Sequence, residues 1–283
     1  MNCHEPQSHR SGKLREICEE LVVPETGVVV VGHGTANRVG AAETKSVVAQ
    51  VDAILPNIPV ELGYLEVIEP TIEMAVERLA ARGCKRVVAL PILLFTAGHA
   101  KQDIPQALQE AVARHGLSVM QADPLGLHEQ VISLARHRFY EAIEGLAPIE
   151  GGSEALLIIG RGSSDPTASH QLWSFVRSTY SSLVSVAKYR FAISFVAAAK
   201  PTVSEAVDQL MLGIKGRPPV QRVVLHPHLL FHGHVETQVE KYLEKMRSQF
   251  PAVEWVKVSR LGAAQEVADA LVDRGLRCLC STN

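Results

Sequence analysis

Short apolar runs alternate with amphipathic stretches through the first half of the chain. The apolar runs are rich in β-branched residues and are bounded by glycine or proline, as buried strands are; they cover residues 27–35, 60–66, 86–95 and 117–124. Apolar residues at helical spacing occupy the intervening segments, residues 40–54, 70–82, 102–114 and 127–145. This alternation predicts an α/β fold, in which helices cover both faces of a parallel sheet.

The same order of elements returns after a glycine-containing break, APIEGGSE, at residues 147–154. ALLIIGRGSSDP matches VVVVGHGTAN, FVAAAKPTVSEAV matches YLEVIEPTIEMAV, RVVLHPHLLFHGH matches RVVALPILLFTAGH and, more weakly, VEWVKVSRLG matches LSVMQADPLG. These ordered matches indicate an internal duplication. We therefore expect an N-terminal extension over residues 1–26 and two α/β domains, over 27–147 and 154–276, that face each other across a cleft.

Composition narrows the class of protein. The chain has 283 residues, a hydrophobic fraction of 47% and a net charge of −2. It can therefore form two ordinary cores, and it lacks the basic excess of nucleic-acid-binding proteins. The N-terminal segment has no apolar core of a signal peptide, and no apolar run approaches the roughly 20 residues of a membrane span. We expect a soluble, cytoplasmic protein that binds neither nucleic acid nor membrane.

The five cysteines are irregularly spaced and odd in number, which argues against a disulfide framework. Cys278 and Cys280 lie in the tail RCLCSTN. Such a pair either binds a metal ion or consists of two reduced thiols at a frayed chain end, and the second interpretation is favoured.

Three polar side chains follow successive strands of the first half: His33 after the first, Glu66 at the end of the second and His99 after the third. Ligand sites in such sheets lie beyond the carboxyl ends of the strands, so these groups should converge. Two imidazoles and a carboxylate suit Co²⁺, Ni²⁺, Fe²⁺ or Zn²⁺, and they can also accept protons near neutral pH. Taken singly, each fits an ordinary hydrogen-bonded or solvated loop residue; their joint placement favours a site.

The GHGT turn at residues 32–35 has two glycines, as phosphate-binding loops often do. It lacks the third glycine of a dinucleotide motif and the Lys-Ser/Thr pair of a P-loop. A nucleotide-binding regulator is therefore disfavoured.

The second copy has lost most of this constellation. Arg161 stands at the position of His33 and Ala197 at that of Glu66, whereas His234 still matches His99. We therefore expect one metal site per chain, in the first half.

A histidine cluster near the third strand of the second copy is a separate candidate. His226, His228 and His232 would share one face of a strand with a period of two. Either a further metal site or a polar wall at the end of the sheet would explain them.

VVVVGHGTAN, YLEVIEPTI and LPILLFTAGHAKQDIP resemble the motifs of the sirohydrochlorin chelatase family of class II chelatases, and RGSSDP is similar to the second domain of its long members. The resemblance covers nearly the whole chain from about residue 27. It implies two flavodoxin-like domains and the ATP-independent insertion of a divalent metal ion into sirohydrochlorin or a related tetrapyrrole, in cobalamin or sirohaem biosynthesis. Co²⁺ is the favoured metal, with Fe²⁺ or Ni²⁺ as the other choices.

The resemblance also implies residue roles. His33 and His99 would hold the metal ion and, with Glu66, carry out catalysis. The metal would be a substrate, and we expect no permanently bound cofactor. Candidates for binding the carboxylates of the tetrapyrrole are Arg38, Lys101, Arg161 and His234. The alternative is a non-catalytic carrier of metal or tetrapyrrole; the three polar groups of the first half favour the enzyme.

Overall fold

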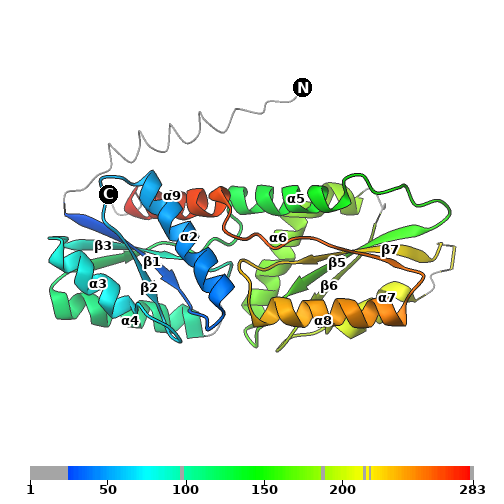
Figure 1. The fold of residues 1–283 in the computed structure, drawn as a ribbon, viewed down its shortest axis with the longest axis horizontal. Helices are drawn as coiled ribbons and strands as arrows, with labels where there is room; N and C mark the ends of the chain where they lie inside the picture. Colours follow the sequence, from blue (N-terminus) through cyan, green and yellow to red (C-terminus); the bar gives the residue numbers. More distant parts are fainter. Residues whose placement is uncertain (1–24, 96–98, 186–188, 213–214, 217, 281–283) are drawn as a thin grey trace, which may run out of the picture. The chain divides into compact units, whose positions relative to one another are not determined.

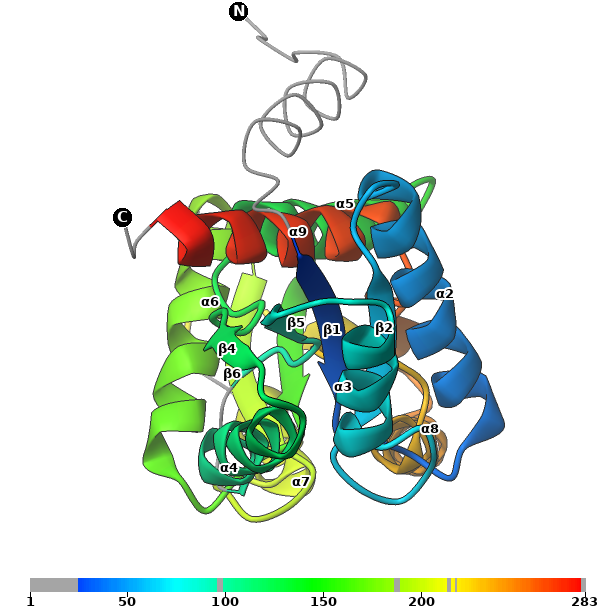
Figure 2. The ribbon, with the colours of Figure 1, turned by 90° about the vertical axis from the view of Figure 1, so that its left-hand side faces the viewer.

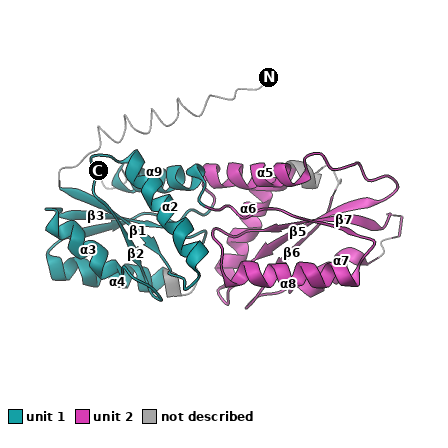
Figure 3. Ribbon diagram, viewed as in Figure 1, with its two compact units in different colours: residues 1–126, 263–283 teal, residues 127–262 magenta. Residues whose placement is uncertain are grey.

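Strands and helices alternate through the described chain (Figure 1). The computed structural model describes residues 25–95, 99–185, 189–212, 215–216 and 218–280, and the side chains of residues 99, 100 and 182–185 lie outside this description. The chain divides into two compact units, unit 1 with residues 1–126 and 263–283, and unit 2 with residues 127–262 (Figure 3). Among the described residues, no helix is both long and apolar enough to cross a membrane.

The described part of unit 1 is built on a four-stranded parallel sheet in the order β2-β1-β3-β4. Its elements are β1 (Thr26–Gly32), α2 (Arg38–Ile54), β2 (Val60–Tyr64), α3 (Ile72–Ala81), β3 (Arg86–Pro91), α4 (His99–His115), β4 (Ser118–Gln121) and α9 (Gln265–Cys280).

Helices cover both faces of this sheet (Figure 2). Val29 and Val31 of β1 pack with α3 and α4, while α2 and α9 contact each other on the opposite side. Strand β1 is therefore buried along its whole length, which explains its unbroken run of valines. Asn37 caps α2 by accepting hydrogen bonds from two backbone N–H groups, so the chain turns into a helix soon after leaving β1.

Unit 2 repeats this plan in its described residues, with the parallel strand order β6-β5-β7-β8. Its elements are α5 (Glu129–Ile143), β5 (Ser153–Gly160), α6 (Pro166–Ser185), β6 (Tyr189–Phe195), α7 (Val203–Met211), β7 (Val220–Pro227), α8 (His234–Gln249) and β8 (Glu254–Lys257). The two parallel sheets confirm the predicted α/β fold class and the repeated order of elements. The arrangement across a cleft stays a prediction.

The last helix of each sequence repeat belongs to the other unit. Helix α5 follows β4 in the chain but packs in unit 2, where Phe139 contacts the rings of Tyr180 and Tyr189 edge-on at centroid distances of 5.4 and 6.0 Å. Helix α9 follows β8 but packs on β3 and α2 of unit 1. The compact units are therefore not the contiguous domains predicted over residues 27–147 and 154–276. Those two ranges describe the repeat in the sequence, and as domains they stay a prediction. Helical periodicity identifies the apolar face of a helix but does not identify the sheet that it covers.

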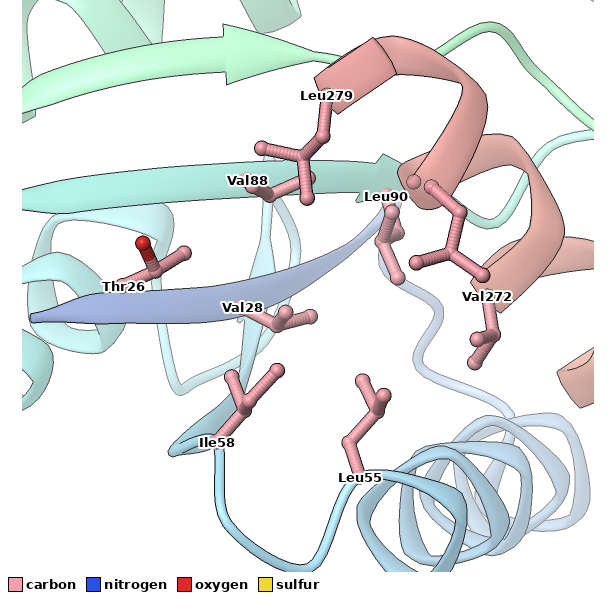
Figure 4. A pocket seen from close by; sticks show the side chains of 10 residues that line it. Thr26, Val28, Leu55, Ile58, Val88, Leu90, Val272 and Leu279 are labelled. Atoms are coloured by element: carbon pink, nitrogen blue, oxygen red, sulfur yellow. The ribbon is translucent and has the colours of Figure 1, made fainter. Parts of the chain in front are cut away.

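A small apolar cavity lies under α9 in unit 1 (Figure 4). Its volume is about 30 Å³, and its lining is apolar apart from Thr26. Gly275 of α9 forms part of the wall beside Leu90 of β3, because a Cβ atom at this glycine would lie 2.9 Å from Leu90 Cδ2. Thr26 and Val28 place the cavity toward the amino end of β1, whereas His33 follows the carboxyl end.

Candidate functional site

His33 and Glu66 meet at the carboxyl edge of the unit 1 sheet. Strands β1 and β2 are adjacent and parallel, and their last residues, Gly32 and Tyr64, are register partners. The residues that follow are therefore held side by side. The His33 Nε2 atom lies 3.1 Å from Glu66 Oε1, and the two side chains are 38% and 59% exposed. The structure thus brings together two of the three predicted groups, in a position open to solvent and ligand.

The contact with Glu66 bears on which nitrogen of His33 is available. An ionised carboxylate only accepts hydrogen bonds, so its position 3.1 Å from Nε2 favours the neutral tautomer that carries its proton on Nε2. In that tautomer the lone pair lies on Nδ1, which can bind a cation or take a proton. A carboxylate partner also helps to fix the orientation of the ring, as it does for histidine ligands of metals.

The loops that carry His33 and Glu66 also contact each other through their backbones. The Glu66 N–H group donates to the His33 carbonyl oxygen at 3.1 Å. Gly34 has a φ of 101°, and a Cβ atom there would lie 1.9 Å from the Glu66 carbonyl oxygen. Only glycine fits this approach, which explains the second glycine of the GHG motif.

His99 begins helix α4, which follows β3. Strand β3 is the other neighbour of β1, so its carboxyl end shares the edge that carries His33. The side chain of His99 and the preceding Gly98 lie outside the described residues, so the predicted convergence of this imidazole with the pair stays a prediction.

The two basic side chains predicted to bind substrate in the first half begin the helices at this edge. Arg38 is the first residue of α2 and Lys101 lies in the first turn of α4, and both are exposed. Both begin helices that start at the carboxyl edge, and their role in binding a ligand there stays a prediction.

Unit 2 has the same loop backbone with different side chains. The Ala197 N–H group donates to the Arg161 carbonyl oxygen at 3.0 Å, and a Cβ atom at Gly162 would lie 1.7 Å from the Ala197 carbonyl oxygen. Arg161 is exposed, as is His234 at the start of α8. No imidazole–carboxylate pair corresponding to His33 and Glu66 can form at these positions.

His226 and His228 lie on one face of the sheet, as predicted, but both are buried against helix α6. The Tyr180 hydroxyl group bonds to Nδ1 of His226, and the His228 ring stacks on Phe175 at a centroid distance of 3.9 Å. Burial lowers the pKa of each histidine to about 3, so both rings are neutral at physiological pH.

His232 is half-buried in the loop after β7. The described residues include no group of three or more His, Cys, Asp or Glu side chains that could hold a metal ion. Two of the three predicted histidines thus lie in the interior of unit 2, and the choice between a metal site and a polar wall stays open.

The cysteine tail differs from its prediction as a frayed end. Cys278 and Cys280 lie in the last turns of α9, and neither forms a disulfide. Burial, and then the negative charge of Asp123, raise the pKa of the Cys278 thiol. The helix continues to Cys280 because its apolar face covers β3, a contact that the polar tail sequence does not reveal.

Two exposed valines were missed by sequence reasoning. Val39 is 51% exposed and Val67 is 61% exposed, and each lies a few residues from one member of the His33–Glu66 pair. Val67 has a φ of 75°, which is rare for a β-branched residue. No sequence signal identifies it, because valine is the opposite of what such a backbone favours.

Comparison with known proteins gives the same two-part pattern as the internal repeat. The CbiX family model matches residues 27–142 and again residues 155–277. A sirohydrochlorin cobaltochelatase of Priestia megaterium is 28% identical over 251 residues, which are 87% of this chain and 78% of that protein. A sirohydrochlorin ferrochelatase of Bacillus subtilis is 27% identical over 249 residues, covering 87% of this chain and 89% of that protein.

A solved structure shares the fold. It is described as SirB from Bacillus subtilis with Fe3+, and it aligns with a TM-score of 0.75 at 24% identity, over 91% of this chain and 97% of that one. At this level of identity the likeness supports the architecture of the two units.

Proposed function

Because the chain belongs to the CbiX family, we propose that it is a lyase that inserts a divalent metal ion into sirohydrochlorin without ATP, as in cobalamin or sirohaem biosynthesis. Co²⁺ is the favoured metal, and Fe²⁺ and Ni²⁺ are the other candidates. The observation that carries the proposal is the pairing of His33 Nε2 with Glu66 Oε1 at 3.1 Å, on an open sheet edge next to the strand that leads to His99.

The chemistry requires two tasks at one place. The free tetrapyrrole carries two pyrrole N–H protons, which must leave as the metal ion enters, and the metal ion must exchange water for pyrrole nitrogen. A neutral imidazole can bind the metal or accept a proton, but one nitrogen cannot do both at once. We assign metal binding to His33 and His99 and proton acceptance to the same imidazoles together with Glu66.

The pairing with Glu66 favours proton acceptance at His33. A proton that reaches Nδ1 makes an imidazolium ion, and the Glu66 carboxylate, 3.1 Å from Nε2, is placed to stabilise this charge. Exposure of both side chains lets the proton pass to water. The same openness leaves coordination positions for the pyrrole nitrogens, so the protein holds the metal ion loosely enough to release it.

Basic side chains would hold the carboxylates at the rim of the tetrapyrrole. Arg38 and Lys101 belong to the edge that carries the pair, and Arg161 and His234 are the candidates from unit 2. Arg161 is suited to this task because a guanidinium group repels a metal ion and pairs with a carboxylate. These contacts, the absence of a permanently bound cofactor, the lack of nucleic-acid or membrane partners and the cytoplasmic location stay predictions.

A metallation assay tests the proposal. Purified protein is mixed with sirohydrochlorin and Co²⁺, Ni²⁺ or Fe²⁺, and the absorbance change of the ring is followed against the spontaneous reaction. Catalytic turnover, with many rings metallated per protein molecule, is the expected result. Binding spectra without acceleration would contradict it and favour the alternative, a carrier of metal or tetrapyrrole.

A further inference from the structure

The loop that follows β2 makes a tight turn at Val67. The Ile68 N–H group donates to the Glu66 carbonyl oxygen at 2.9 Å, and Val67 between them has a φ of 75°. This is the positive-φ form of the γ-turn, which is rare and strained. Strain of this kind persists where surrounding contacts enforce it, and it concentrates at binding and catalytic sites.

The turn is held from both sides. The Glu66 N–H group is bonded to the His33 carbonyl oxygen, and the Tyr64 N–H group donates to the Pro70 carbonyl oxygen at 2.8 Å. Gly34 also lies so close to the Glu66 carbonyl oxygen that a Cβ atom would not fit between them. The backbone therefore fixes the direction of the Val67 side chain relative to the carboxylate beside it.

This fixed side chain is directed to solvent and not to the core. In the described part of unit 1, the large hydrophobic residues that are exposed are Val67 at 61% and Val39 at 51%. Val67 follows Glu66 directly, and Val39 lies in the first turn of the helix that follows His33. Apolar side chains next to a few polar groups are typical of ligand-binding sites, and both valines belong to the segments that carry the polar pair.

Unit 2 offers an internal comparison. The aligned positions hold Ala198, which also has a positive φ of 54°, and Thr167. Unit 2, which lacks the His–Glu pair, thus keeps the positive φ at this position but lacks both valine side chains. A positive φ here does not require valine, so both valines occur only in the unit that carries the His–Glu pair.

We propose that Val67, supported by Val39, packs against the face of the tetrapyrrole and holds the ring beside His33. This inference rests on the proposed function of the same site. Carboxylates at the rim of the ring are recognised by basic side chains, but the flat apolar face gains most from contact with exposed apolar groups. A strained, rigid turn provides that contact without loss of side-chain freedom on binding.

The test is equilibrium binding of metal-free sirohydrochlorin to Val67→Ala and Val67→Gly, followed by absorbance. We expect the Kd to rise roughly four- to fifteen-fold for Val67→Ala, the range for losing contact with two partly to fully buried methyl groups. The Kd for Co²⁺ alone should not change. Val67→Gly should lose at least as much affinity while its Tm stays at or above that of the wild type, because glycine adopts positive φ without penalty.

Leu212→Ala is the matched control, since Leu212 is 65% exposed and lies in unit 2 at the end of α7; it should leave the Kd unchanged. An unchanged Kd in both Val67 variants, or a wild type that does not bind sirohydrochlorin, overturns the inference. A wild type whose binding depends on Val67 but which does not metallate the ring supports the inference and contradicts the proposed function. A wild type that metallates the ring, with a Kd that neither Val67 variant changes, supports the proposed function and contradicts the inference.

Discussion

The carboxyl edges of the two units share a backbone and differ in side chains. In unit 1 the Glu66 N–H group bonds to the His33 carbonyl oxygen, and in unit 2 the Ala197 N–H group bonds to that of Arg161 in the same way. The loops are therefore a property of the fold, which survives without the pair. Under the proposed function, a few side chains on this common frame decide whether an edge can bind a metal ion and accept protons.

In the interiors of the units, it is unit 2 that carries the polar side chains. Leu90 and Ile92 of unit 1 are buried and apolar, whereas unit 2 places buried His226 and His228 at the aligned positions. Unit 1 thus combines a polar edge with an apolar core, and unit 2 carries its imidazoles inside. The buried pair ties the stability of unit 2 to pH, because these rings stay neutral in the folded state.

The largest expected effect comes from removing an imidazole at the unit 1 edge. His33→Ala and His99→Ala should each lower the metallation rate about 10²–10⁴-fold, the usual contribution of a positioned acid–base group. The initial rate of the absorbance change measures this loss. The double variant should be little worse than either single variant, because groups that act as one unit are not additive; clean multiplication of the two effects would show that they act separately.

His115→Ala is the control for this experiment. His115 Nε2 lies 3.1 Å from Glu73 Oε1, the same spacing as in the His33–Glu66 pair, but His115 ends α4 whereas His99 begins it. The rate of this variant should equal that of the wild type. A comparable loss of activity would mean that any surface histidine–carboxylate pair has the effect.

Acidification should destabilise the protein through the histidines of unit 2. Their folded pKa of about 3 lies below the unfolded value of about 6.5, so the unfolded chain binds protons that the folded chain excludes. Their contribution to stability is complete above about pH 6.5 and is lost as the pH falls toward about 3. At pH 5 the loss should reach about 4 kcal/mol for the pair, from about 1.4 kcal/mol per pH unit for each ring.

Urea unfolding at pH 7.5 and pH 5 measures this loss. His226→Leu with His228→Ile gives unit 2 the residues of unit 1, and Tyr180→Phe removes the hydroxyl group that bonds His226. The triple variant should show a much smaller difference between the two pH values. An unchanged difference would assign the acid sensitivity to other groups.

Arg161→Ala should have an intermediate effect on substrate binding. A charge-assisted pair with a substrate carboxylate is worth about 1.5–3 kcal/mol, so KM for sirohydrochlorin should rise roughly 10–150-fold with a smaller change in kcat. Steady-state kinetics separate the two parameters. Arg177→Ala, an exposed arginine on α6, is the control. Equal KM values in both variants would remove Arg161 from the substrate site.

The smallest expected effect is on stability, at Gly275 of α9. The aligned residue in α5 is Phe139. A Cβ atom at Gly275 would press on Leu90 Cδ2, but Leu90 also lines the cavity and can turn into it. Gly275→Ala should therefore raise the free energy of unfolding by about 0.5–1 kcal/mol, the helix propensity gain of alanine over glycine. Thermal unfolding measures this change, and a lower Tm would show that Leu90 cannot move.

The sequence predicts the repeated strands and helices and the meeting of His33 with Glu66, because each depends on local pattern and on strand adjacency in a parallel sheet. It does not predict the exchange of α5 and α9, because an amphipathic helix fits either sheet. It also fails at Val67, where contacts from neighbouring loops impose a backbone that valine disfavours. The burial of His226 and His228 depends on Tyr180 and Phe175 from α6, a partner that strand periodicity does not identify.

The exchange of helices has a consequence for synthesis on the ribosome. The strands of unit 1 are complete at Gln121, but α9, which covers Val88 and Leu90, begins only at Gln265. At roughly 5–20 residues per second, the nascent chain leaves this apolar face uncovered for about 8–30 s while all of unit 2 is translated. A ribosome that stalls in this interval, or a gene cut near residue 150, releases a sheet without its last helix and an α5 without its aromatic partners. Such products should be substrates for chaperones and proteases.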